Sequence, residues 1–364
     1  MKMSKKVLVV IGTRPNVIKI TRFKKVAESM NGMDIRLVHT HQHFDPNMSD
    51  VFLAQFDVDV DHFIPQFKGT TNEHIAHIMM HLDAEFRTYN PDLVVVVGDV
   101  TSTLTAALTA RNLRIPIAHL ESGLRSKDMD MPEEINRILT DKITDYYFVT
   151  EPDGLKNLKS EGVADDKVFY VGNTMIDTLV HFEDKITSNK ILEDLGVNGA
   201  YALFTMHRPS NVDTKEGIHK LCAFLSDLTE HISVVFPLHH RTKSKLETYN
   251  MLELLKSNKK LYLCPALDYF AFQHLIAKSE VVITDSGGIQ EETTALQIPC
   301  YTLRENTERP VTITEGTNIL MGFDSEFILN AIKNKDYKEG RIPDLWDGYA
   351  TERVLAVIDK VIEG

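Results

Sequence analysis

Short apolar runs alternate with amphipathic segments along most of this chain. The runs are rich in Val and Ile, as at residues 7–11 and 93–97, which is typical of β-strands. Because they are apolar at consecutive positions, they resemble strands that are covered on both faces. The segments between them, such as residues 72–89 and 100–111, have the apolar spacing of helices. The alternation predicts an α/β fold built from doubly wound parallel sheets.

The alternation occurs twice, on either side of a charged, glycine-containing break at residues 182–198. At 364 residues the chain is also long for a single hydrophobic core. We therefore predict an N-terminal Rossmann-like domain at residues 1–182, a C-terminal one at residues 183–345, and a final helix at residues 346–364 that packs back on the N-terminal domain. The predicted strands are residues 7–11, 35–39, 93–97, 115–120, 146–149, 168–171, 201–205, 234–237, 261–263, 281–284 and 300–303.

Composition and charge narrow the classes of partner. Hydrophobic residues make up 43% of the chain and charged residues 25%, and the formal charge of −12 leaves no basic excess to neutralise a nucleic acid. Cys222, Cys264 and Cys300 are widely spaced in apolar contexts, which favours a reducing compartment over disulfides or a zinc site. The first apolar run is too short for a signal peptide, and no run approaches the ~20 residues of a membrane span. We expect a cytoplasmic protein without nucleic-acid or membrane partners.

Cations follow the first predicted strand. The stretch "GTRPNVIK" places Gly12 at a tight turn and brings Arg14 and Lys19 close to the start of a helix. Such residues are also common in solvated loops. Two cations beside a glycine turn at a strand end nevertheless favour an anion site.

Carboxylates follow two other strands of the first half and begin a helix. Asp99 ends the run at residues 93–97, Glu121 ends the next run, and Glu133 and Glu134 stand in a first helical turn ahead of Arg137. Each has an alternative structural explanation, since Asp99 is a common helix cap and acidic residues complement the helix dipole. Together they indicate acid/base chemistry, because clustered carboxylates raise one another's pKa and hold a proton near neutral pH.

The second half has the features of a phosphate site. In "DSGGIQEE", Ser286, Gly287 and Gly288 follow a strand and precede a helix predicted at residues 289–296, and a helix start binds phosphate well. His207 and His239 each follow a strand and are each followed closely by arginine, a pairing that also favours phosphate.

Several enzyme classes lack support in the sequence. The chain contains no HExxH or paired-cysteine metal pattern, no Walker loop, no G-x-S-x-G elbow and no G-x-G-x-x-G dinucleotide motif. We therefore expect neither a metal nor a cofactor. The residues by themselves leave two classes open, a glycosyltransferase and a nucleotide-sugar isomerase.

Seven motifs carry a resemblance to a known family. In order they are "GTRPNVIK", "GDVTSTL", "HLESGLRS", "MPEEINRILTD", "TMHRPSN", "DSGGIQEE" and "RENTERPVTITEGTN". The resemblance that they carry extends from residue 10 to residue 318. Together they resemble the non-hydrolysing UDP-N-acetylglucosamine 2-epimerases. The resemblance implies a GT-B-like fold of two Rossmann-type domains with an interdomain active-site cleft, and a homodimer. It also implies interconversion of UDP-GlcNAc and UDP-ManNAc through 2-acetamidoglucal, for surface polysaccharide precursors.

The same resemblance assigns roles to individual residues. It makes Asp99, Glu121 and Glu133 the acid/base carboxylates, without saying which is the acid, and places His207 at the diphosphate and sugar. Within the UDP site it gives Glu292 to the ribose hydroxyls and the Phe272 backbone to uracil. The complete substrate-binding set is Arg14, Lys19, Arg137, His239, Phe272, Ser286, Gly287, Gly288, Glu292 and Arg309.

The chain also departs from the family pattern. Asn16 replaces the glutamate of "GTRPE", Ser122 replaces an alanine, and Pro209 and Ser210 stand in "HRPS" where bacterial members have "HRRE". The segments "HQHFDPNM" and "PQFKGT" likewise differ from the "QHREM" and "PGQ" that help form a regulatory substrate site. We therefore expect no obligatory activation by the substrate.

Alternative activities remain. The stretch "HFDPNMSDVF" resembles epimerases that act on UDP-2,3-diacetamido-2,3-dideoxy-glucuronate, which makes that sugar the alternative substrate. A GT-B glycosyltransferase is the alternative reaction. Hydrolysing epimerases fit less well, because they carry "GSRAE"-like and "GGE" motifs in place of "GTRP" and "ESGLR".

Overall fold

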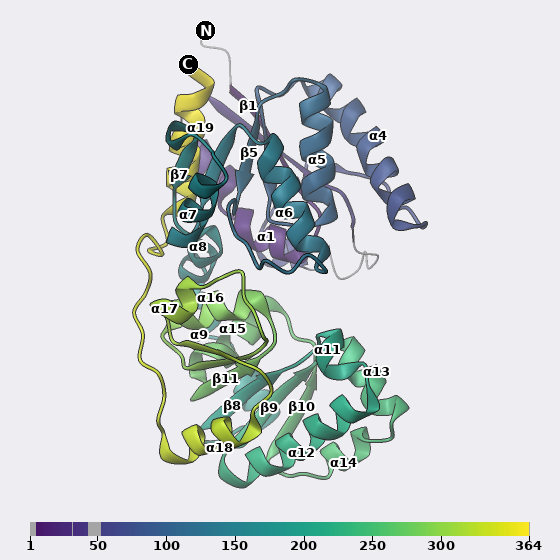
Figure 1. Ribbon diagram of the computed structural model, residues 1–364, viewed down its shortest axis with the longest axis vertical. Helices are drawn as coiled ribbons and strands as arrows, with labels where there is room; N and C mark the ends of the chain where they lie inside the picture. Colours follow the sequence, from purple (N-terminus) through teal and green to yellow (C-terminus); the bar gives the residue numbers. More distant parts are fainter. Residues whose placement is uncertain (1–4, 31, 43–51, 364) are drawn as a thin grey trace. The chain divides into compact units, whose positions relative to one another are not determined.

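A computed structural model describes residues 5–30, 32–42 and 52–363 of the chain (Figure 1). It divides into two compact units, the first formed by Met1–His181 and Asp344–Gly364 and the second by Phe182–Pro343. Apart from its last residue, the stretch "HFDPNMSDVF" lies outside the described residues, as does "HQHFDPNM" after Gln42. The prediction of two α/β domains with parallel sheets is confirmed.

The first unit contains a seven-stranded parallel sheet in the order β3-β2-β1-β4-β5-β6-β7. Its strands are β1 (Lys5–Ile11), β2 (Met33–His39), β3 (His62–Phe63), β4 (Leu93–Val97), β5 (Ile117–Leu120), β6 (Tyr146–Val149) and β7 (Val168–Tyr170). Its helices are α1 (Arg14–Ile20), α2 (Phe23–Glu28), α4 (Thr71–Tyr89), α5 (Thr101–Asn112), α6 (Pro132–Ile143), α7 (Pro152–Ser160), the 3₁₀ turn η1 (Asp165–Lys167), α8 (Thr174–His181) and α19 (Ala350–Glu363).

The second unit contains a six-stranded parallel sheet in the order β10-β9-β8-β11-β12-β13. Its strands are β8 (Tyr201–Thr205), β9 (Ser233–Leu238), β10 (Leu261–Pro265), β11 (Val281–Thr284), β12 (Cys300–Leu303) and β13 (Asn318–Met321). Its helices are α9 (Glu183–Thr187), α10 (Ile191–Leu195), α11 (Pro209–Val212), α12 (Lys215–His231), α13 (His240–Thr248), α14 (Leu252–Lys256), α15 (Tyr269–Lys278), α16 (Gly287–Leu296), α17 (Val311–Thr314) and α18 (Ser325–Asn334).

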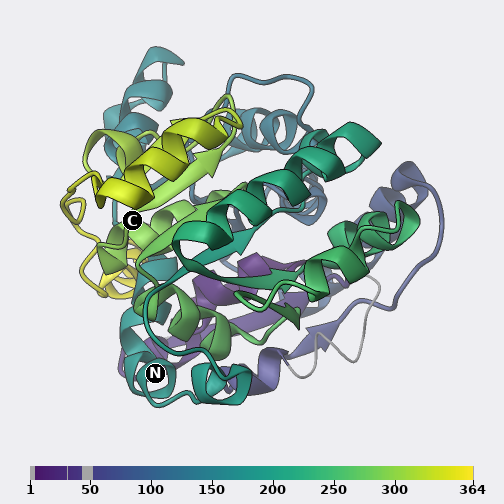
Figure 2. The same ribbon diagram turned by 90° about the horizontal axis from the view of Figure 1, so that it is seen from below.

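Helices bury the sheets on both faces, which explains the continuous apolar runs. In the first unit, Val94 and Val96 of β4 pack with α4 and α5. In the second, α12 and α18 cover one face of the sheet, as Figure 2 shows, and α15 and α16 pack on the other. Each strand therefore presents apolar side chains in both directions.

The strand orders place a switch point in each sheet. The chain turns from β1 to β2 on one side and to β4 on the other, and β8 separates β9 from β11 in the same way. In doubly wound sheets ligands bind at the carboxyl ends of the strands beside such a point. The loops after β1 and β4, and those after β8 and β11, are therefore the expected binding loops.

Three predictions about elements are corrected. Strands β3 and β13 were not predicted, and the break at residues 182–198 contains α9 and α10. Helix α16 begins at Gly287 rather than residue 289, so both glycines lie in its first turn. Glycine is a poor helix former, which hid this start from the sequence pattern.

Candidate active site

The loop after β1 is joined to the end of β4 by Asn16. Its Oδ1 accepts from the backbone N–H groups of Gly12 and Thr13 at 3.1 and 3.2 Å, and its Nδ2 donates to the Val97 carbonyl at 3.1 Å. A glutamate, the family residue here, has no proton to donate to that carbonyl when ionised. The Asn16 side chain therefore connects the loop after β1 to the end of β4.

Glu121 lies directly after β5 and forms a buried ion pair with Lys19, with side-chain exposures of 5% and 9%. Its φ of +75° is unusual for a residue with a side chain and costs on the order of 1–3 kcal/mol. The Phe148 carbonyl holds this conformation by accepting from the Glu121 and Ser122 N–H groups at 3.0 and 3.1 Å. Such strain clusters at functional sites, which fits the role predicted for Glu121.

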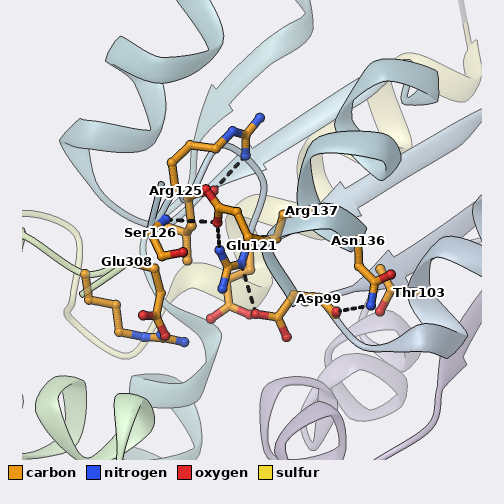
Figure 3. A network of polar contacts seen from close by, with 12 residues as sticks. Asp99, Thr103, Glu121, Arg125, Ser126, Asn136, Arg137 and Glu308 are labelled. Carbon is orange, nitrogen blue, oxygen red and sulfur yellow. Dashed lines mark hydrogen bonds and ion pairs between the residues drawn. The ribbon is translucent and has the colours of Figure 1, made fainter. Parts of the chain in front are cut away.

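Asp99 is oriented by Arg137. Arg137 Nε lies 3.0 Å from Asp99 Oδ2, and its Nη1 bonds to Glu134, which also accepts from the Ser126 and Lys127 N–H groups at 2.9 and 2.8 Å (Figure 3). The cap of α5 is Val100, so the interpretation of Asp99 as a helix cap is wrong. Arg137, which the sequence assigned to the substrate, is buried between two carboxylates.

Glu133 is separate from these pairs. It is exposed in the first turn of α6 and makes no hydrogen bond or ion pair with any described residue. Its neighbour Glu134 points inward instead. Arg14 is half-buried, with its guanidinium 5.6 Å from the centre of the Phe52 ring. The structure thus charge-pairs Asp99 and Glu121 but not Glu133.

Gly98 allows the loops of Asp99 and Glu121 to approach each other. Its φ is +66°, and a Cβ there would lie 3.2 Å from Glu121 Oε2 and 3.4 Å from Lys19 Nζ. A side chain at this position is therefore disfavoured by both conformation and space. This requirement was not recognised on the sequence.

In the second unit, Asp285 holds His207. Asp285 is fully buried and accepts from the His207 and Arg208 N–H groups, from Asn211 Nδ2 and from His207 Nδ1 at 2.9 Å. Burial acts to raise the pKa of Asp285, but His207 and these backbone donors lower it overall. The His207 ring therefore donates through Nδ1, while its Nε2 has no partner among the described residues.

His239 lies beside His207, with ring centres 5.0 Å apart. Its Nδ1 accepts from the Arg241 N–H at 3.3 Å. Burial, together with His207, His240 and Arg241, lowers the pKa of His239 to about 4. His239 is therefore neutral at physiological pH and offers Nε2 as a hydrogen-bond donor.

The start of α16 is open to an anion. Ser286 occupies the cap position without a side-chain cap bond, which leaves first-turn N–H groups for a ligand. A Cβ on Gly287 would lie 2.8 Å from Glu308 Oε1 and 3.0 Å from Arg309 Nη1. A larger residue here would displace these charged side chains from the helix start.

Two arginines near this helix differ in their partners. Arg309 contacts Glu291 Oε2 at 2.6 Å through Nε and bonds to Glu308 through Nη1. Arg304, also buried, binds Glu308 at 2.9 Å through Nη2, but its Nη1 has no hydrogen-bond partner among the described residues. That Nη1 lies 3.6 Å from the Cβ position of Gly287. Arg304 was missed on the sequence because its motif offered two arginines without showing their partners.

The residues expected at the nucleoside lie on α15 and α16. Burial, helped by Glu291, raises the pKa of Glu292 to about 7, while a bond from Gln273 opposes the shift. Phe272 is half-buried and packs against the core under α15. Glu292 has no ion-pair partner in the part of the chain that the structure describes, so it is suited to accept hydrogen bonds from ligand hydroxyl groups.

The described residues have neither a cluster of metal ligands nor a helix suited to span a membrane. They contain no group of three or more His, Cys, Asp or Glu side chains that could hold a metal ion. No helix in residues 5–30, 32–42 or 52–363 is long and apolar enough to cross a membrane.

Known proteins are similar to this chain in sequence and in fold. Residues 25–359 match the family model described as UDP-N-acetylglucosamine 2-epimerase. The chain belongs to this family. A relative of that name from Methanocaldococcus jannaschii is 34% identical over 97% of this chain and 98% of its own length. The UDP-2,3-diacetamido-2,3-dideoxy-D-glucuronate 2-epimerase of Pseudomonas aeruginosa is also 34% identical, over 90% of this chain and 91% of its own.

A solved structure supports the same assignment. The M. jannaschii UDP-GlcNAc 2-epimerase in complex with UDP-GlcNAc and UDP aligns with a TM-score of 0.86, and the match covers 98% of this chain and 99% of that one. The predicted family is confirmed, and so is the GT-B-like class of two parallel-sheet domains.

Proposed function

We propose that this family member is a non-hydrolysing UDP-N-acetylglucosamine 2-epimerase that interconverts UDP-GlcNAc and UDP-ManNAc. The observation that carries the proposal is the pair of carboxylates, Asp99 and Glu121, at the ends of adjacent strands, each held by a buried cation. Two carboxylates held in fixed positions are the groups that acid/base catalysis at one carbon atom requires.

The reaction needs a base, an acid and a site for the leaving group. One carboxylate takes the C2 proton of the sugar while the C1–O bond breaks and its electron pair leaves with UDP, which gives 2-acetamidoglucal. UDP then adds back to C1, and a proton reaches C2 from the opposite face. Asp99 and Glu121 are the primary acid/base candidates in this proposal. Glu133, exposed at the start of α6, is the third.

The second unit supplies the groups for UDP. In this proposal the diphosphate binds at the start of α16, where Ser286, Gly287 and Gly288 present N–H groups and Arg304 Nη1 adds a cation. His207 Nε2 stabilises charge on the departing phosphate. Glu292 accepts from the ribose hydroxyls, as its burial without a cation suggests.

The other residues of the predicted binding set are assigned as follows in this proposal. Arg14 contributes positive charge toward the leaving UDP, whereas Lys19 is paired with Glu121, and the Phe272 backbone contacts uracil. Arg309 and Arg137, which the resemblance places in the binding set, hold carboxylates rather than substrate in this proposal. Arg309 already contacts Glu291 and Glu308. Arg137 already contacts Glu134 and Asp99.

Proton NMR of UDP-GlcNAc incubated with the protein in D2O tests the proposal. Loss of the C2 proton signal together with the manno epimer is the expected result. Release of free UDP with N-acetylmannosamine would instead indicate a hydrolysing enzyme. If UDP-GlcNAc is unchanged and transfer requires an added acceptor, the protein is a glycosyltransferase.

A second substrate has support of its own. The P. aeruginosa relative named for UDP-2,3-diacetamido-2,3-dideoxy-D-glucuronate has the same 34% identity as the M. jannaschii relative, over 90% rather than 97% of this chain. The same NMR experiment with that sugar distinguishes the two, because the carboxylate at C6 and the second acetamido group at C3 change the contacts of the sugar but not the chemistry at C2.

We also propose a cytoplasmic homodimer that supplies surface polysaccharide synthesis. All three cysteines are free and buried, which suits a reducing compartment. Helices α4, α5 and α6 are neighbours (Figure 1). They expose apolar side chains, including Met80, Leu108, Ile135 and Leu139, which gives a second copy an apolar surface. Light scattering after size-exclusion chromatography should give twice the 41.3 kDa chain mass.

A further inference from the structure

A fully buried histidine lies beneath the two charge-paired carboxylates. His119 is in β5, two residues before Glu121, and none of its surface is exposed. Its ring spans two partners, with Nδ1 2.7 Å from Asp141 Oδ1 on α6 and Nε2 2.7 Å from the Gly98 carbonyl oxygen. Neither the comparisons nor the motif assignments gave His119 a role.

Both ring nitrogens of His119 carry a hydrogen. The Gly98 carbonyl can only accept, so Nε2 donates to it. Burial acts to raise the pKa of Asp141, but His119 and Arg125 outweigh burial and lower it, so this carboxylate is ionised and also accepts. The His119 ring thus bridges the Gly98 carbonyl and the Asp141 carboxylate inside the core of the first unit.

Each ring nitrogen of His119 is connected to one of the two loops that carry Asp99 and Glu121. Gly98 immediately precedes Asp99, and its N–H donates to the Leu120 carbonyl at 3.0 Å while its carbonyl accepts from His119. On the other side, Asp141 Oδ2 accepts from the Gly123 N–H at 3.1 Å, two residues after Glu121. One side chain thus ties the loop of Asp99 to the loop of Glu121.

We propose that His119 is a positioning residue, which sets the separation of Asp99 and Glu121 by bridging the Gly98 carbonyl to Asp141. This inference rests on the proposed epimerase function. Removal and return of a proton at C2 require two carboxylates at fixed positions relative to one carbon atom. A displacement of about 1 Å costs such a reaction on the order of 100-fold in rate.

Arg125 and Tyr147 complete the surroundings of Asp141. Arg125 Nη2 lies 2.7 Å from Asp141 Oδ2, and its Nε lies 2.9 Å from Glu161 Oε1, so Asp141 keeps a cation when His119 is replaced. The Tyr147 hydroxyl bonds to the backbone carbonyls of Asp141 at 2.8 Å and Thr144 at 3.1 Å, and not to either ring nitrogen of His119. Loss of His119 therefore leaves Asp141 charge-paired, and its main consequence falls on the hydrogen bond to the Gly98 carbonyl.

Two substitutions each remove one of the two hydrogen bonds of the His119 ring and can retain the other. In His119→Gln the longer amide can still donate to the Gly98 carbonyl but loses Asp141, and in His119→Asn the shorter amide reaches Asp141 but loses Gly98. We expect kcat for epimerisation to fall about tenfold or more in both variants, further in His119→Asn, with KM and UDP affinity changed less than about threefold. Tyr147→Phe is the matched control, because it removes a buried hydrogen bond to Asp141 and should lower thermal stability while keeping kcat.

Nitrogen-15 NMR of the wild-type histidine rings gives a test that needs no variant and no substrate. We expect one ring whose two nitrogens both carry protons that exchange slowly with solvent, because both nitrogens of His119 are buried against acceptors. The absence of such a ring, or variants with kcat equal to wild type, would overturn the inference. A wild-type protein that shows the doubly protonated ring but does not epimerise either UDP-sugar would instead refute the proposed function.

Discussion

The two buried arginines beside α16 are predicted to do different things. Arg304 has an unpartnered Nη1 at the helix start, whereas the Nε and Nη1 groups of Arg309 contact Glu291 and Glu308. Replacing each with methionine keeps most of the side-chain volume and removes the charge. The variant Arg304→Met should lose affinity for UDP, and Arg309→Met should lose stability.

The magnitudes follow from these contacts. A charge-assisted hydrogen bond is worth about 1.5–3 kcal/mol, so Arg304→Met should weaken UDP binding roughly 10- to 100-fold. Its cost to folding is limited, because Glu308 keeps its bond to Arg309. Arg309→Met leaves buried Glu291 without the arginine that it contacts, and breaking such a pair costs about 3–5 kcal/mol.

Two measurements on each variant separate these effects. Titration calorimetry gives the Kd of UDP, and denaturant unfolding gives the free energy of unfolding. Binding should be compared at a temperature where circular dichroism shows that both variants are folded. The reasoning would be refuted if Arg304→Met bound UDP as tightly as wild type, or if Arg309→Met lost UDP affinity at unchanged stability.

Three further predictions concern the acid/base residues, pH and regulation. Asp99→Asn and Glu121→Gln should each lower kcat about 100-fold or more while UDP still binds, which C2 exchange in D2O and calorimetry would measure separately. Because the pKa of Glu292 is raised to about 7 in the folded protein from 4.5, it binds more protons when folded, and its contribution to stability is lost as pH rises from about 5 to 7. Unfolding free energies at pH 5 and pH 8 should therefore differ less in Glu292→Gln, by about 3 kcal/mol at most; an unchanged difference would contradict this. Initial rates against UDP-GlcNAc should be hyperbolic, and a sigmoidal curve or a reverse reaction that stalls until UDP-GlcNAc is added would show activation by substrate.

The strands could be predicted from the sequence because parallel sheets covered on both faces leave continuous apolar runs. The two strands that were missed lack this signal. β3 has only two residues, and three of the four residues of β13 are half-buried rather than fully buried. Edge strands of this kind are specified by pairing with a neighbour, which no local pattern records.

The sequence predicted which residues form the site better than it predicted which residues pair with them. Strand ends marked Asp99, Glu121 and His207, but not the partners that hold them. Arg137 and Asp285 reach these residues from loops or helices 38 and 78 residues away in the chain. Such contacts depend on the order and register of strands, and the residue spacing in a motif does not contain that information.

Helix α19 has a consequence for how the protein is made. The chain leaves the first unit at His181 and re-enters it at Asp344, and α19 then packs on α2 and α8, with Lys5 bonded to Asp359. During synthesis the N-terminal sheet therefore emerges early but lacks this helix until Ala350–Glu363 has been made. The second unit is contiguous and can fold first. Ribosome-stalled chains ending before residue 344 should resist protease in the second unit and be cleaved in the first.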